Sequence, residues 1–84
     1  MPTLGRDSRS VRLRTVLSCL ADAREARGLS RTAVAANMGT SEAAVARLEA
    51  GRVDPRISTL ERYAAAVGKD LDWRIVDAHR KVGE

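Results

Sequence analysis

The 84-residue sequence is poor in aromatic side chains, in cysteine and in long apolar runs. Its aromatic residues are Tyr63 and Trp73, which are too few for a surface that stacks the bases of single-stranded nucleic acid. One cysteine, Cys19, cannot form an intramolecular disulfide, and this favours a reducing compartment. Because no run of 18 apolar residues and no apolar N-terminal signal segment is present, we expect a cytoplasmic protein without a membrane-spanning helix.

The sequence also lacks the residue motifs that are typical of enzymes. The sequence offers no Ser–His–Asp or Cys–His arrangement, no paired carboxylates, no metal-ligand spacing and no glycine-rich phosphate loop. His79 stands in a polar tail, where a solvated side chain is the simpler interpretation. An enzyme is therefore the least favoured class of protein, and no cofactor or metal is expected.

Positive charge is in moderate excess. Lys and Arg number 15 against 11 Asp and Glu, which gives a net charge of +4 and an isoelectric point near 10.2. A chain of this length forms one domain with a modest core. Such a basic domain is compatible with a polyanionic partner, although the excess alone does not decide the matter.

The most informative stretch is residues 30–52, which read SRTAVAANMGTSEAAVARLEAGR. We interpret it as two short helices, residues 30–38 and 41–50, joined by a tight turn at Gly39. Glycine adopts positive φ without steric cost, so it can end the first helix and turn the chain.

Small, glycine and aliphatic residues occupy key positions of this stretch in a fixed register. Ala35 allows two helices to cross closely, and Val45 and Leu48 give the second helix an apolar edge. With Gly39 and the following Glu49-Ala50-Gly51, this register resembles the helix-turn-helix of the Cro/repressor (Xre) family over about residues 12–68. The resemblance implies a DNA-binding domain. The alternative is a plain helical hairpin in a small bundle.

Two further helices flank the central stretch. A first helix should begin near Ser8 or Ser10 and end before Gly28, because apolar residues recur there at helical spacing. A last helix should start at Ser58 with a capping box to Glu61. The predicted organisation is a flexible arm (residues 1–10), a helix-turn-helix domain (11–69), a C-terminal strand (70–76) and a polar tail (77–84).

Residues 70–76 change periodicity. Leu71, Trp73 and Ile75 alternate with Asp72 and Arg74, a pattern typical of a half-buried strand. The alternative interpretation is a fifth short helix, because the segment resembles the L-D-W-L-L sequence that phage-type repressors often carry at this point. A lone strand needs a partner, and the cheapest one is the same strand of a second copy. The predicted fold is thus mainly α, with four helices and a short C-terminal β-strand used in dimerisation through Leu71, Trp73 and Ile75.

The resemblance also assigns roles to side chains. Family members read bases from the positions that are here Ser41, Glu42, Ala43, Ala44, Ala46 and Arg47. The expected phosphate contacts are Arg31, Thr32, Thr40, Arg52 and Arg56. By resemblance, Arg24 and Glu49 form a structural ion pair. Arg47 suits a guanine edge and Glu42 suits cytosine N4, although Glu42 could equally serve the helix dipole, and the loop arginines could simply be solvated.

We therefore expect a homodimeric repressor of double-stranded DNA that acts on a near-palindromic operator. A narrower expectation is an antitoxin with a cognate toxin partner, because GKDLDWRIV resembles the end of HigA-type antitoxins. The alternative is a protein-binding module that keeps the fold with little specific DNA binding. It is motivated by the glutamine-free, alanine-rich face of the second helix in the central stretch.

Overall fold

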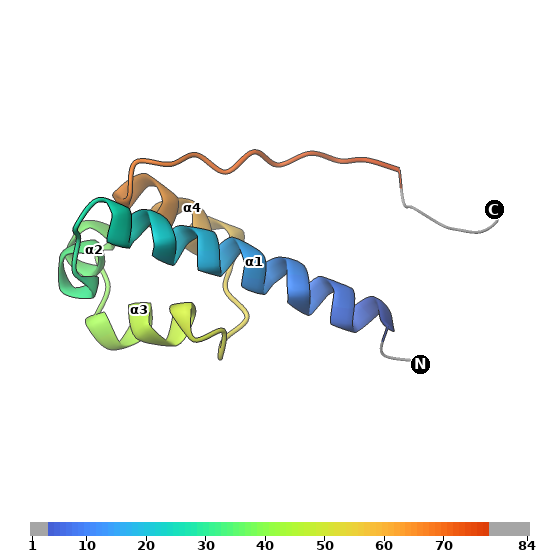
Figure 1. Cartoon of the computed structure of the whole chain (residues 1–84), viewed down its shortest axis with the longest axis horizontal. Helices are drawn as coiled ribbons and strands as arrows, with labels where there is room; N and C mark the ends of the chain where they lie inside the picture. Colours follow the sequence, from blue (N-terminus) through green and yellow to red (C-terminus); the bar gives the residue numbers. More distant parts are fainter. Residues whose placement is uncertain (1–3, 78–84) are drawn as a thin grey trace.

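A computed structural model describes residues 4–77, in which four helices follow one another without a strand (Figure 1). The helices are α1 (Leu4–Ala26), α2 (Arg31–Met38), α3 (Glu42–Glu49) and α4 (Ile57–Ala66). The C-terminal half of α1 lies against the other three helices, while its N-terminal half projects beyond them (Figure 1). No helix of this part of the chain combines the length and the apolar character needed to cross a bilayer.

The core fills the space where the four helices meet. Its buried members recur three and four residues apart along each helix, which places them on one face. They are Leu17, Leu20, Ala23, Val34, Ala35, Met38, Val45, Leu48, Leu60, Tyr63, Ala64 and Val67. The apolar stripes predicted from helical periodicity thus supply the packing, and α2 touches both α3 and α4.

The turn between α2 and α3 has the predicted geometry. Ser30 and Ser41 cap the two helices, since their Oγ atoms accept the backbone N–H of Ala33 at 3.0 Å and of Ala44 at 3.1 Å. Gly39 ends α2 at φ +73°, and the N–H groups of Gly39 and Thr40 donate to the last carbonyl groups of α2. The interpretation as two helices joined at Gly39 is confirmed.

Two predicted helix starts are wrong. The first helix begins at Leu4, so residues 4–10 continue α1 instead of forming an arm. After Pro2 the segment contains no further proline, and nothing in it breaks a helix more strongly than the single Gly5. The last helix begins at Ile57, slightly earlier than predicted, with Arg56 as its N-cap and no side-chain cap, and the N–H groups of Thr59 and Leu60 donate to the Arg56 carbonyl. The predicted capping box at Ser58 is therefore absent.

The C-terminal strand predicted for residues 70–76 is also wrong for the described chain. The segment is extended and forms neither a strand nor a fifth helix (Figure 1), because a ladder needs a second strand and no other described segment supplies one. Leu71 is half-buried against the core, Trp73 Nε1 donates to Glu61 at 2.6 Å, and Ile75 is fully exposed. Residues 1–3 of the predicted arm and 78–84 of the predicted tail lie outside the described residues.

Gly39→Ala should destabilise the fold by about 1–2 kcal/mol, because an L-residue in the left-handed region brings Cβ against the backbone. No heavy atom outside the turn lies within 4 Å of a Cβ built there, so the loss reports backbone strain alone. Urea unfolding followed by circular dichroism measures it. Gly39→Asn is the matched control and should lose less, since Asn tolerates this conformation. Equal losses for both variants would contradict the explanation.

Candidate nucleic-acid interface

Helix α3 presents two different faces. Val45 and Leu48 are almost completely buried against the core. The six residues predicted to read bases lie on the remaining surface of the helix and its N-cap: Ser41, Glu42, Ala43 and Arg47 are exposed, and Ala44 and Ala46 are half-buried. The exposed side of α3 is rich in small side chains, so another surface can approach the backbone of α3 closely. Arg47 is the long hydrogen-bond donor on this side.

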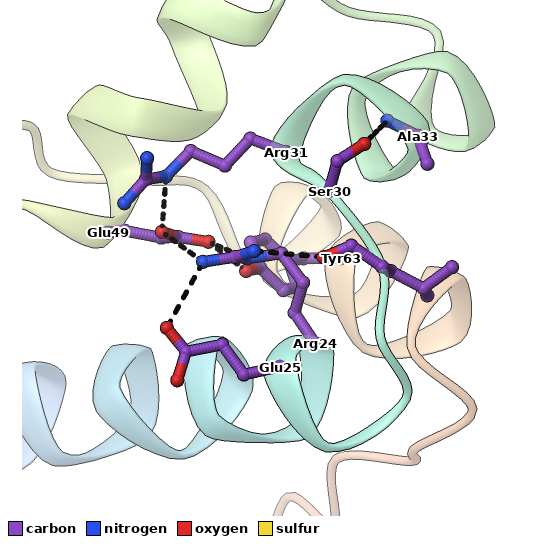
Figure 2. Close-up of polar contacts among 8 residues, drawn as sticks. Arg24, Glu25, Ser30, Arg31, Ala33, Glu49 and Tyr63 are labelled. Carbon is purple, nitrogen blue, oxygen red and sulfur yellow. Dashed lines mark hydrogen bonds and ion pairs between the residues drawn. The ribbon is translucent and has the colours of Figure 1, made fainter.

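A single carboxylate fixes where α3 sits. Glu49 at the end of α3 has a side chain that is only 8% exposed. Its Oε2 accepts Arg24 Nε of α1 at 2.8 Å and the hydroxyl of Tyr63 of α4, and its Oε1 accepts Arg31 Nε of α2 at 2.8 Å (Figure 2). The structure brings Arg24 and Glu49 together as a buried ion pair. It adds two donors, Arg31 and Tyr63, that the sequence did not place there.

The electrostatics of this cluster keep its charges in place. Burial by itself would raise the pKa of Glu49, but the hydrogen bonds from Tyr63, Arg31 and Arg24 outweigh it and hold the pKa below the usual range. Burial, followed by the hydrogen bond to Glu49, raises the pKa of Tyr63 well above that of an ordinary phenol. The hydrogen bond to Glu49 raises the pKa of Arg24. The carboxylate therefore stays ionised and the phenol stays protonated at neutral pH.

Arg24 also ties down the connection between α1 and α2. Its Nη1 donates to the Leu29 carbonyl at 2.9 Å, in addition to the bonds to Glu49. Glu25 comes within 3.6 Å of Arg24 Nη2, but 69% of its side chain is exposed, so water screens this pair strongly. The buried pair with Glu49 is the stronger constraint, and its geometry sets the angle between α1 and α3.

The predicted phosphate contacts lie around α3 on three neighbouring segments. Thr32 and Thr40 are exposed near the starts of α2 and α3, and Arg52 and Arg56 are exposed in the loop that leads to α4. Neither loop arginine forms an ion pair with a side chain of residues 11–77. Arg31 differs from these residues, because Glu49 already holds its Nε. The roles of all five as phosphate contacts stay predictions.

One cation near α3 was missed by the sequence analysis. Arg62 of α4 lines a hollow of about 260 Å³ together with Arg47 of α3. Thr40 and Thr59 line the same hollow. No local spacing connects residues 47 and 62, because only the packing of α4 beside α3 brings them together. Helical spacing from Leu60 shows at most that Arg62 is exposed.

Comparison with known proteins gives the class of this domain. A family model described as helix-turn-helix, HTH_3, matches residues 20–74, which is more than half of the chain. The chain belongs to this helix-turn-helix family, and membership implies a non-enzymatic, DNA-binding regulatory domain of the Xre/Cro type. No curated protein and no solved structure matches the chain.

Arg24→Met should destabilise the domain by about 3 kcal/mol, at the low end of the range for removing one partner of a buried ion pair. The loss stays at that end because Arg31 and Tyr63 still donate to Glu49. Thermal and urea unfolding measure it. Glu25→Gln is the matched control on the same helix turn and should change stability by less than about 0.5 kcal/mol. A similar loss for both variants would show that Glu49 does not depend on Arg24.

Proposed function

We propose that this protein is a sequence-specific repressor that binds double-stranded DNA as a homodimer on a near-palindromic operator. The observation that carries the proposal is the exposed face of α3, on which Arg47 stands among small side chains while Val45 and Leu48 anchor the opposite face. Repression follows from occupancy, since a protein bound across a promoter excludes the transcription machinery.

The dimensions of α3 suit a major groove. Its 8 residues span about 12 Å, and the groove is about 12 Å wide, so the helix can insert its N-terminal part. Arg47 would donate two hydrogen bonds to the O6 and N7 atoms of guanine, and the alanines would contact thymine methyl groups. Glu42 would accept from cytosine N4. Arg52 and Arg56 would contact phosphates and set the register of the helix along the duplex.

Exposed apolar residues support the homodimer. Trp73 is 48% exposed, Val76 is 76% exposed and Ile75 is fully exposed at the extended C-terminal segment. A monomer gains nothing from presenting these side chains to water. A second copy that covers them under a twofold axis would set two α3 helices about 34 Å apart in successive major grooves.

Arg47→Ala should weaken binding to the preferred operator by roughly 5- to 150-fold, because a bidentate arginine–guanine contact contributes about 1–3 kcal/mol of discrimination. It should also relax base preference at one position of each half-site. Selection from random duplexes, with sequencing of the bound fraction, measures both effects. Arg12→Ala removes the same charge from an exposed site on α1 and is the control. The proposal fails if the folded Arg47→Ala protein keeps the wild-type affinity and consensus.

Ile75→Asp should convert a dimer into a monomer, because a carboxylate at the covered apolar surface would be desolvated without a partner. Sedimentation velocity across a concentration series measures the oligomeric state. Ile57→Asp is the control, since Ile57 is 58% exposed at the start of α4 and away from the C-terminal segment. A wild-type protein that is monomeric at every concentration, or an Ile75→Asp protein that remains dimeric, would exclude this surface.

The antitoxin role and the protein-binding module stay predictions. The match to the family extends over the helix-turn-helix and identifies no toxin partner. The likeness to HigA-type antitoxins is confined to the sequence GKDLDWRIV, and residues 70–76 form no strand in the described chain.

A further inference from the structure

We propose that Glu49 positions Arg31 to grip a DNA phosphate beside α3, in addition to bracing the helix itself. The inference rests on the proposed DNA-binding function and adds one positioning residue, Glu49, behind one contact residue, Arg31. It depends on the geometry of a hydrogen bond between side chains of α2 and α3.

The hydrogen bond between Arg31 and Glu49 uses only the Nε–H group of Arg31 and leaves its Nη1 and Nη2 groups free to bind another acceptor. Arg31 Nε lies 2.8 Å from Glu49 Oε1, and no atom of residues 11–77, whose side chains the structure describes, accepts a hydrogen bond from Nη1 or Nη2 of Arg31. The Arg31 side chain is 46% exposed, whereas that of Glu49 is 8% exposed. One edge of the guanidinium is therefore fixed to the protein, and the other edge presents its N–H donors to solvent.

Glu49 does not need Arg31 for its own neutralisation. Arg24 and Tyr63 already donate to the carboxylate from the buried side. Arg31 also lies in the first turn of α2, where the helix dipole favours negative charge and disfavours a cation. Two arginines thus converge on one buried carboxylate, while Glu25 faces Arg24 and not Arg31 (Figure 2). Among the residues that contact Glu49, Arg31 is the cation turned toward solvent.

The position of Arg31 suits a phosphate that flanks α3. Arg31 lines a groove of about 620 Å³ between α1 and α3, together with Ala46 of α3, the C-cap residue Ala50 and several residues of α1. Arg47 and Arg62 line a separate hollow at the opposite edge of α3, which Ala44 and Leu48 share. When α3 enters a major groove and Arg47 reads a base, Arg31 and Arg62 therefore stand at the two edges of the helix, where the two phosphate backbones of the groove run.

Holding Nε in advance strengthens such a contact. An arginine normally loses rotamer freedom when it binds, and one that is already held by a carboxylate has lost much of it beforehand. Its free edge still offers two parallel N–H groups to two phosphate oxygens, a geometry that lysine does not reproduce. Glu49 thereby acts on DNA binding through Arg31 without touching the DNA.

The test measures the slope of log Kobs against log salt concentration on one operator duplex, for variants confirmed as folded by circular dichroism. We expect Arg31→Gln to reduce the magnitude of the slope by about 0.9, the value for one phosphate contact. Base preference should not change. Glu49→Gln should reduce the slope by a similar amount, and should reduce it no further when Arg31→Gln is already present. Arg74→Gln, at an exposed arginine paired with Asp72, is the charge-matched control and should leave the slope unchanged.

A second measurement avoids variants that fail to fold. In the wild-type protein the Arg31 Nε–H resonance, assigned by its loss in Arg31→Lys, should exchange slowly with solvent both free and bound to the duplex. An unchanged salt slope in Arg31→Gln, or loss of the Nε–H protection on DNA binding, would overturn the inference while the proposed function stands. A wild-type protein that binds no duplex at low salt would overturn both.

Discussion

The arrangement of the whole domain depends on the buried carboxylate of Glu49. Its partners come from every other helix: Arg24 from α1, Arg31 from α2 and Tyr63 from α4. A carboxylate removed from water is costly unless strong donors satisfy it, and here three donors do so. Each donor holds its helix against Glu49, so satisfying this one group ties all four helices together. Apolar packing by itself tolerates sliding and rotation far better.

This constraint is important because the apolar core is small. Many of its members are alanine or valine, and the largest fully buried side chain is Tyr63, which is also a member of the Glu49 cluster. The aromatic ring packs with the core while its hydroxyl donates to the carboxylate. Core and cluster are therefore joined through one residue. The position of α3 is set twice, through Val45 and Leu48 by packing and through Glu49 by hydrogen bonds.

Features that depend on neighbouring residues could be predicted from the sequence. The two helices of residues 30–52 and the left-handed Gly39 follow from local chemistry, and the structure has them. Tertiary contacts could not be predicted in the same way. Arg31 and Tyr63 reach Glu49 across 18 and 14 positions of the sequence, and Arg62 reaches the hollow beside Arg47 only through the packing of α4.

Errors in the prediction have physical causes of the same kind. Alternation of Leu71, Trp73 and Ile75 indicates an extended backbone, and the segment is extended, but a strand also requires a hydrogen-bonding neighbour that the described chain lacks. Leu71 packs against the core instead. At the start of α4 the local capping signal at Ser58 is overridden, because the helix already begins at Ile57 and the Arg56 carbonyl accepts the N–H groups of Thr59 and Leu60. Side-chain caps are thus preferences that a longer helix can override.

The separation between the inner and outer faces of α3 explains how such a domain can be both rigid and adaptable. Val45, Leu48 and Glu49 determine where the helix sits, and none of the three is needed to contact a base. Glu42, Ala43 and Arg47 lie on the outer side, where substitution leaves no cavity in the core and no carboxylate without partners. Exposed changes of this kind usually alter stability by less than about 0.5 kcal/mol. The outer side chains of α3 can therefore change the DNA sequence that is read, while the cluster at Glu49 keeps α3 at one angle to the rest of the domain.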